Sequence, residues 1–226
     1  MFVKLLGLLT TGFFLGMQHS LDPDHVAAVS TIVSKNTSLK KSALVGAVWG
    51  LGHTSILLLI GLVVMILKLS IPERLSQVLE LLVGVMLLYL GLMLLKNVIG
   101  DELHIHKHKH GEIEHIHLHS HKGGPNHEHL HRPFFIGVVH GLAGSAGILL
   151  LIMASMPSLF QGLLFTLIFG MGSVLGMVLC GAIISLPFRF AQRFGRLNNS
   201  LMFLAAILTI TIGIQVLQEN WSVFYG

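Results

Sequence analysis

The stretch GMQHSLDPDH, residues 16–25, places two histidines and two aspartates directly after an apolar stretch that holds one charged residue, Lys4. The chain that follows is also mostly apolar: of its 226 residues, 53% are hydrophobic and 11% are charged. This composition is typical of an integral membrane protein, in which about 20 apolar residues cross the bilayer as one helix. Because charged groups are costly inside a membrane, the ionisable side chains at 16–25 indicate a functional site.

Several stretches of the sequence are long and apolar enough to cross a membrane. We expect an all-α integral membrane protein with six transmembrane helices, at residues 2–22, 42–67, 75–99, 134–156, 159–186 and 198–219. The first stretch is not followed by the small residues of a signal-peptide cleavage site, which favours a transmembrane helix over a secretory signal. The single cysteine, Cys180, excludes an intramolecular disulfide and is expected to be buried.

The basic residues predict the orientation of these helices. If the chain begins outside the cell, eleven of its 14 lysines and arginines lie on the cytoplasmic side. These eleven are Lys35, Lys40, Lys41, Lys96, Lys107, Lys109, Lys122, Arg132, Arg189, Arg193 and Arg196. Since basic residues concentrate in cytoplasmic loops, we expect a multi-pass protein of the plasma membrane, with both termini outside and the loop at 100–132 in the cytoplasm. Topology thus accounts for the net charge of +4, and no nucleic-acid partner is expected.

Two motifs recur on either side of the loop. GMQHSL at 16–21 resembles GVVHGL at 137–142, and WGLGHTS at 49–55 resembles FGMGSVL at 169–175. The first residues of the two motifs are 33 positions apart in the first half and 32 in the second. The chain therefore contains an internal repeat, in which His19 corresponds to His140 and His53 to Ser173.

Three helices in each half require the second copy to enter the membrane from the opposite side. We therefore expect two inverted three-helix repeats, residues 1–99 and 133–226, each with a broken first helix. A proline, Pro72 or Pro187, precedes the third helix of each half. Inverted repeats are typical of secondary transporters, which bind their substrate near the middle of the membrane where helices are broken.

Pro23 predicts where the first helix breaks. Proline lacks a backbone N–H and disfavours helical geometry at the preceding residue, here Asp22. An unbroken helix would scatter His19, Asp24 and His25 around its axis, whereas a break can turn them toward one point. Imidazole and carboxylate ligands without a thiolate suit a divalent transition metal such as nickel, cobalt, zinc or copper(II).

The two aspartates also have a plainer interpretation. We expect either Asp22 or Asp24 to cap the helix that begins near His25, because a short carboxylate accepts hydrogen bonds from the free N–H groups of a first turn. Capping requires one of them and explains neither His19 nor His25. Both aspartates therefore stay candidate metal ligands beside the two histidines.

Two more histidines lie in predicted transmembrane helices and are candidate ligands. His53 follows Gly52 in the WGLGHTS motif, and His140 lies between Gly137 and Gly141. Small residues at such spacings let helices approach closely. Each histidine could instead serve as a hydrogen-bonding residue between helices, so the sequence leaves both interpretations open.

The loop at 100–132 differs from the rest of the chain. Its segment HIHKHKHGEIEHIHLHSHKGGPNHEHLH, residues 104–131, holds eleven of the 15 histidines. A tract of this kind does not form a core and tends to chelate transition metals with changing sets of ligands. It predicts an unselective metal store or collector, and the alternative is a disordered linker that responds to pH.

These residues resemble the motifs of the nickel/cobalt permease family. HSLDPDH at 19–25 is similar to that family's signature of histidine, four residues, aspartate and histidine, and WGLGHTS is similar to its second Gly-His motif. HGLAGSAG at 140–147 resembles the short six-span members described as urease-accessory nickel transporters. The resemblance implies that His19, Asp24 and His25 form the centre of the metal site and that His53 contributes to it. Residues 134–186 contain no Asp or Glu, unlike the later helices of longer members.

The residues and the resemblance together predict secondary transport of a divalent metal ion, Ni²⁺ or Co²⁺, as substrate. The chain has no phosphate-binding loop and no HExxH motif, so we expect neither ATP hydrolysis nor an enzyme, and no catalytic cofactor. Uptake is the first hypothesis, because an inside-negative potential favours entry of a cation. Proton-coupled export and membrane-anchored metal storage are the alternatives. The bilayer is a partner, and cytoplasmic metallochaperones or metalloenzyme maturation proteins are candidate partners.

Overall fold

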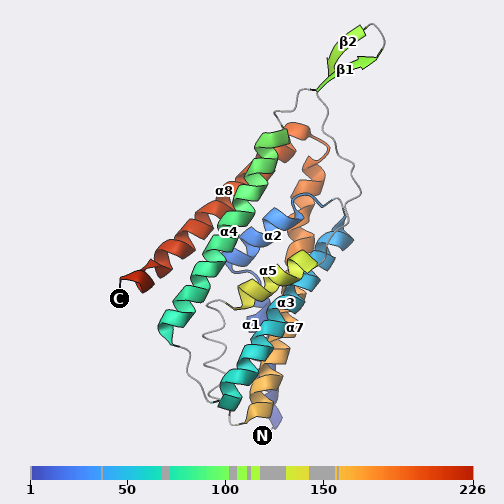
Figure 1. Cartoon of the computed structure of the whole chain (residues 1–226). Helices are drawn as coiled ribbons and strands as arrows, with labels where there is room; N and C mark the ends of the chain where they lie inside the picture. The colour runs from blue at the N-terminus through green and yellow to red at the C-terminus, as the bar shows by residue number, and fades with distance from the viewer. Residues whose placement is uncertain are drawn as a thin grey trace.

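The computed structural model describes residues 2–36, 38–67, 72–101, 106–110, 113–117, 131–142, 156 and 158–225. Within these ranges the chain is helical apart from one two-stranded hairpin (Figure 1). The elements in chain order are α1 (Phe2–His19), α2 (Pro23–Val33), α3 (Leu39–Leu67), α4 (Glu73–Asp101), β1 (His106–His110), β2 (Ile113–His117), α5 (His131–Gly141), α7 (Leu159–Ala191), α8 (Gly195–Asn220) and the short 3₁₀ helix η1 (Trp221–Phe224).

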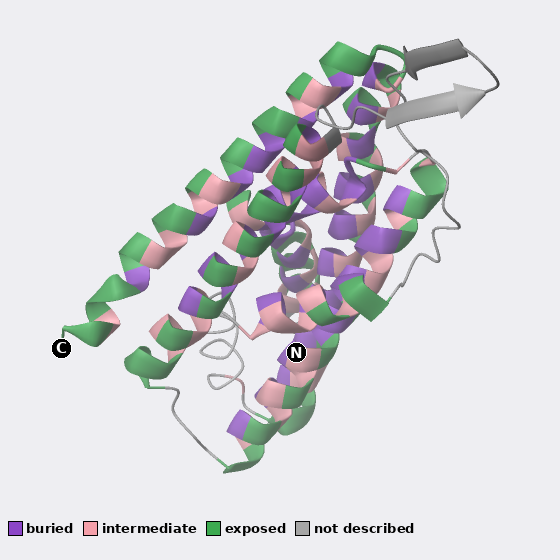
Figure 2. Cartoon of the chain, turned by 45° about the horizontal axis from the view of Figure 1, so that its top comes forward, coloured by how far each residue is buried: buried purple, intermediate pink, exposed green. Residues whose placement is uncertain are grey.

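Four of the helices are long and apolar enough to cross a membrane. In the described part of the chain these are Leu39–Leu67, Glu73–Gly100, Leu159–Ala191 and Gly195–Phe224. They coincide with four of the six predicted spans and confirm a helical membrane protein. Figure 2 shows buried residues along the inner faces of the long helices and exposed residues on their outer faces, where large apolar side chains such as Leu59 and Phe190 are available to lipid.

The first and fourth predicted spans have a different outcome. Residues 2–22 are a helix only as far as His19, where α1 ends after 18 residues. Helix α5 covers the start of the predicted span 134–156 and ends at Gly141, and residues 143–155 lie outside the described part of the chain. The count of six spans and the break in the second repeat therefore stay predictions.

Two antiparallel helix pairs form the body of the protein. Helix α3 packs on α7, with Gly46 against Met177 and Gly50 against Val174. Helix α4 packs on α8, and the two lie side by side along one edge of the molecule (Figure 1). Since the facing residues of α3 and α7 run in opposite order, these two helices point in opposite directions.

The shorter helices α1 and α5 each pack on one helix of the central pair. Helix α1 runs alongside α7, and a Cβ added at Gly16 would meet the carbonyl oxygen of Phe169 and the backbone nitrogen of Ser173. Helix α5 runs alongside α3, and a Cβ added at Gly137 would meet the carbonyl oxygen of Trp49 and the backbone nitrogen of His53. These positions need glycine because backbone lies directly against backbone.

Helix α2 is too short to cross a membrane. Its 11 residues extend about 16 Å, roughly half of the apolar thickness of a bilayer. It lies between the α3/α7 and α4/α8 pairs, where Ala28, Val29 and Val33 are buried in a core with Trp49 and Leu87. The hydroxyl groups of Ser30, Thr31 and the C-cap residue Ser34 donate hydrogen bonds to carbonyl oxygens of the preceding turn, so these polar groups are satisfied inside the protein.

The end of helix α7 differs from the expectation. The predicted span 159–186 stopped before Pro187, but α7 includes this proline and continues to Ala191. Proline removes one hydrogen-bond donor, and membrane helices tolerate the loss where neighbouring groups compensate. Pro187 therefore lies inside the helix rather than between the second and third helices of its half.

The histidine-rich loop contains an antiparallel hairpin. Strands β1 and β2 pair in a register that sets His106 opposite His117 and His108 opposite His115. The hairpin follows α4, beyond the ends of the long helices in Figure 1. The two strands cover residues 106–110 and 113–117, and the other residues between 102 and 130 lie outside the described part of the chain.

The close backbone packing of α5 on α3 can be tested with one added methyl group. Gly137→Ala is expected to lower the free energy of unfolding by about 1–3 kcal/mol, because α5 must move away from Trp49 and His53. The measurement is the midpoint of thermal unfolding in detergent. Gly7→Ala is the control, since an added Cβ there meets nothing within 4 Å among the described residues. Equal midpoints for the two variants would contradict the packing described above.

Candidate metal site in the broken helix

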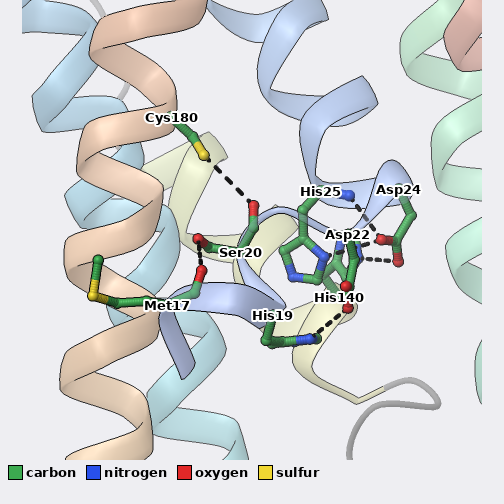
Figure 3. A network of polar contacts seen from close by, with 8 residues as sticks. All are labelled: Met17, His19, Ser20, Asp22, Asp24, His25, His140 and Cys180. Atoms are coloured by element: carbon green, nitrogen blue, oxygen red, sulfur yellow. Dashed lines mark hydrogen bonds and ion pairs between the residues drawn. The ribbon is translucent and has the colours of Figure 1, made fainter. Parts of the chain in front are cut away.

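The chain breaks its first helix where Pro23 predicts. Helix α1 ends at His19 and α2 begins at Pro23, and a tight turn joins them, in which the N–H of Asp22 donates to the carbonyl of His19 over 3.1 Å. The backbone of Asp22 is extended, with φ −58° and ψ 144°, as expected for a residue before proline. Figure 3 shows how this turn directs the side chains of His19, Asp24 and His25 toward one region.

Four imidazole rings gather at the break, although three different parts of the chain supply them. The ring of His25 lies at the centre: its centroid is 4.5 Å from that of His19, 5.4 Å from that of His53 and 4.0 Å from that of His140. The rings of His19 and His53 are 5.2 Å apart. The structure therefore brings together all four histidines that the sequence nominated as candidate ligands outside the loop at 100–132.

The two aspartates hold these rings by hydrogen bonds. Asp22 Oδ2 is 2.7 Å from His19 Nδ1. Asp24 contacts two rings, with Oδ1 3.1 Å from His25 Nδ1 and Oδ2 2.8 Å from His140 Nε2 (Figure 3). Asp24 thus connects the broken helix of the first half to α5 of the second half, 116 positions away.

The capping expectation holds only in part. Asp22 occupies the N-cap position of α2, but within the described residues its side chain accepts no capping hydrogen bond. Its carboxylate is turned to His19 instead. Asp24 Oδ1 accepts a hydrogen bond from the backbone N–H of His25 over 2.8 Å, so it satisfies one free donor of the first turn while it also contacts the imidazoles.

Several imidazole nitrogens are buried without a partner. Among the described residues, no hydrogen-bond partner exists for Nε2 of His19, Nε2 of His25, either nitrogen of His53 or Nδ1 of His140. The exposed fractions of these histidines are 9%, 1%, 0% and 1%, respectively. Burying a polar group without a hydrogen bond destabilises a protein by about 1–3 kcal/mol. Unpartnered nitrogens that share one region are what a metal-binding site offers in the absence of its ion.

The ligand atoms fall into two groups of three. One group combines His19, His25 and His53, and the other combines Asp24, His25 and His140. In each group, one ligand atom from every residue lies within 4.8 Å of those of the other two. Both groups can close around a single metal ion with small side-chain movements.

The first group has the features of a transition-metal site. It presents imidazole nitrogens, and carboxylates bind the opposite nitrogens of two of its rings: Asp22 on His19 and Asp24 on His25. In metalloproteins such outer carboxylates orient a ligating histidine and increase its basicity. Asp22, whose side chain is 48% exposed, therefore lies behind the first group rather than in it.

One residue of the site lies half-way along a long apolar helix. His53 is the midpoint of α3, which has 29 residues from Leu39 to Leu67, so about 21 Å of helix extend on either side. By length and composition this helix is long enough to cross a bilayer, with His53 half-way between its ends.

Trp49 is a site residue that the sequence reasoning missed. Its ring stacks on that of His25, with centroids 5.8 Å apart and planes 11° apart, and lies 5.6 Å from the ring of His140. Trp49 precedes His53 by four positions, so the helical period places both on the same face of α3 and could have identified it.

Two further residues of interest lie beside the site. Cys180 is buried as expected, and its Sγ is 3.7 Å from the carbonyl oxygen of Ser20 (Figure 3). Ser173, which corresponds to His53 in the repeat, is buried, and its hydroxyl has no hydrogen-bond partner among the described residues. The side chains of the histidines at 104–130 lie outside the described part of the structure.

Comparisons with known proteins give the family context. The family model described as high-affinity nickel-transport protein matches residues 5–218. The urease accessory protein UreH of Bacillus sp. (strain TB-90) is 39% identical over 212 residues, which cover 94% of this chain and 91% of that protein. No solved structure matches the chain.

More distant relatives include a plant protein and a bacterial transporter. The chloroplast protein FOR GROWTH AND FERTILITY 2 of Arabidopsis thaliana is 30% identical over 225 residues, or 96% of this chain and 56% of the plant protein. The high-affinity nickel transport protein of Cupriavidus necator (strain ATCC 17699) is 29% identical over 73 residues, or 32% of this chain and 21% of that protein.

The position of Trp49 offers a direct assay of the site. The chain has two tryptophans, so Trp221→Phe leaves Trp49 as the one indole. Ni²⁺ is expected to quench the fluorescence of Trp49. Adding His53→Ala to Trp221→Phe should raise the Ni²⁺ concentration that gives half of the quenching about 10–100-fold, because one ligand is lost. Ser55→Ala, on the exposed face of α3, is the matched control. The same titration curve for both variants would show that His53 takes no part in binding.

Proposed function

The chain belongs to the family of high-affinity nickel-transport proteins, and we propose that it carries Ni²⁺ through the membrane by way of the histidines at the break between α1 and α2. Membership of a transport family, with a urease accessory protein among the relatives, makes the chain a transport protein and not an enzyme. The observation that best supports this route is the set of buried imidazole nitrogens without partners around His25.

The proposed site replaces the water that surrounds the ion in solution. Three imidazoles, from His19, His25 and His53, supply nitrogen ligands in a region that water hardly reaches. Two carboxylates lie behind or beside them, and their combined formal charge of −2 matches a divalent cation. A charge in the membrane interior usually requires such a partner, so we propose that the site strips and neutralises the ion at the middle of its path.

The ligand set supports nickel without excluding cobalt. Imidazole nitrogen is a good ligand for Ni²⁺, and the general order of affinities places Co²⁺ just below Ni²⁺ for the same ligands. We therefore propose Ni²⁺ as the main substrate and Co²⁺ as a weaker competitor at the same histidines. Geometry of the bound state then determines the discrimination between them.

We also propose that the two halves form inverted repeats of three helices. The supporting observation is the correspondence of contacts: Gly16 lies on Phe169 and Ser173 of the second half, and Gly137 lies on Trp49 and His53 of the first. These are the residues that the repeated motifs equate. The pairs α3/α7 and α4/α8 then lie across the axis that relates the halves, and the site lies where α2, α3 and α5 meet.

The proposed direction is uptake into the cell. A divalent cation moving toward a negative interior gains about 4.6 kcal/mol per 100 mV, twice the value for a single charge. Entry therefore needs no coupling ion. This proposal includes the plasma membrane as location, external termini and a cytoplasmic loop at 100–132, as the distribution of basic residues predicts.

In this arrangement the histidine-rich loop receives the ion. The hairpin register places His106 beside His117 and His108 beside His115, which supports a role in collecting metal that has crossed. Because a relative of this chain is a urease accessory protein, we propose that a cytoplasmic metallochaperone or maturation protein takes nickel from the loop. The loop is also the feature that favours the two alternatives, proton-coupled export and membrane-anchored storage.

Flux measurements separate these hypotheses. The purified chain in liposomes with an inside-negative potential is expected to transport Ni²⁺, and His25→Ala should reduce the flux to background, because His25 belongs to both groups of ligand atoms. Replacing residues 102–130 by a flexible linker of the same length should leave flux in place and change its dependence on nickel concentration.

Other outcomes would redirect the proposal. Tight nickel binding without flux under the potential, but flux when a proton gradient is imposed, would support export. Loss of all nickel binding on replacement of residues 102–130, with no effect of His25→Ala, would support storage in the loop.

A further inference from the structure

The two groups of ligand atoms share one residue. His25 belongs to the group with His19 and His53 and also to the group with Asp24 and His140. Its Nδ1 lies 3.1 Å from Asp24 Oδ1, whereas its Nε2 is buried and has no partner among the described residues. One nitrogen of the ring is therefore engaged by the group with Asp24, and the other is left unused.

The two groups differ in chemistry and in accessibility. The group with His19 and His53 offers three imidazoles and is nearly closed to solvent, since His53 is fully buried. The group with Asp24 and His140 offers a carboxylate and two imidazoles, and the side chain of Asp24 is 29% exposed. We call them the inner and the outer position. We expect an arriving cation to reach the outer position first, because it includes the partly exposed carboxylate of Asp24, whereas the three ligands of the inner position are all buried histidines.

Resting on the transport function proposed above, we propose that one metal ion occupies these two positions in succession, and that it passes between them by exchanging ligands around His25. The ion leaves Asp24 and His140 as it gains His19 and His53. His25 changes tautomer in this step: Nε2 gives up its proton and binds the ion, while Nδ1 takes up a proton and donates it in a hydrogen bond to Asp24 Oδ1, so the ring stays neutral. No stage of this movement leaves the ion without protein ligands in the membrane interior.

The geometry makes the two positions alternatives rather than a binuclear site. A neutral imidazole has one lone-pair nitrogen at a time, so His25 serves one position and then the other. Two divalent cations sharing one ring would also repel each other strongly in a region of low dielectric constant. When the ion leaves the outer position, Asp24 and His140 close on each other in the hydrogen bond of 2.8 Å that the structure contains.

His140 is the residue that distinguishes this relay from a single site. In a relay it ligates the ion only at the outer position, and its loss slows delivery without weakening the inner position. In a single four-histidine site its loss weakens binding and flux together. If it serves only to hold Asp24, a side chain that keeps the hydrogen bond replaces it without effect.

The test uses the full chain with Trp221→Phe, so that Trp49 reports nickel binding while liposome flux is measured on the same preparation. His140→Gln keeps a hydrogen-bonding group near Asp24 but is a poor metal ligand. In this variant, the Ni²⁺ concentration that quenches Trp49 fluorescence is expected to equal that of the parent. Flux is expected to fall about 10–100-fold, which is the size of effect that changes around a metal site commonly have. His140→Cys, which restores a metal ligand, is expected to recover flux.

Three results would overturn the relay. They are flux at the parent's rate in His140→Gln, a parallel loss of affinity and flux in that variant, and no recovery in His140→Cys. Absence of flux in the parent chain would instead contradict the transport function itself, and the relay would fall with it. The two failures are therefore distinguished before any histidine is changed.

Discussion

An imidazole nitrogen that is buried without a hydrogen bond destabilises a folded chain, and this protein gathers several of them in one place. The arrangement persists because the opposite nitrogens of three of the rings are bound to carboxylates, at 2.7, 3.1 and 2.8 Å. Each of these three rings is thereby held with its other nitrogen unused. A divalent cation supplies the missing partner, and the same contact that stabilises the fold then holds the substrate.

Backbone packing gives this site its precision. Glycines at 16 and 137 bring α1 onto α7 and α5 onto α3 with no side chain between the backbones. The contact of α5 with α3 places His140 within reach of Asp24, and the break at Pro23 turns His25 toward both. The site depends on three features together. Helix α1 ends inside the protein, α5 is packed closely on α3, and the short acidic side chains of Asp22 and Asp24 bind the rings. None of these features would suffice alone.

The sequence predicted which residues form the site better than it predicted the contacts between them. Pro23 predicted the broken helix, and matched motifs nominated His53 and His140, because proline and periodic spacing constrain the backbone directly. The bond between Asp24 and His140 was not predictable, since it joins residues 116 positions apart and depends on how two helices are rotated. The capping role expected of one aspartate was incomplete for a related reason: the extended backbone of Asp22 turns its carboxylate to His19. Pro187 was placed between helices because local rules ignore the packing that carries α7 to Ala191.

The most direct test of the central claim is to locate nickel in the protein by anomalous scattering at the nickel absorption edge, from crystals of the nickel-loaded chain. We predict a peak within ligand distance of His25 and of either the His19 and His53 pair or the Asp24 and His140 pair. Nickel confined to the histidine-rich loop, with the four rings at the helix break unliganded, would contradict the account.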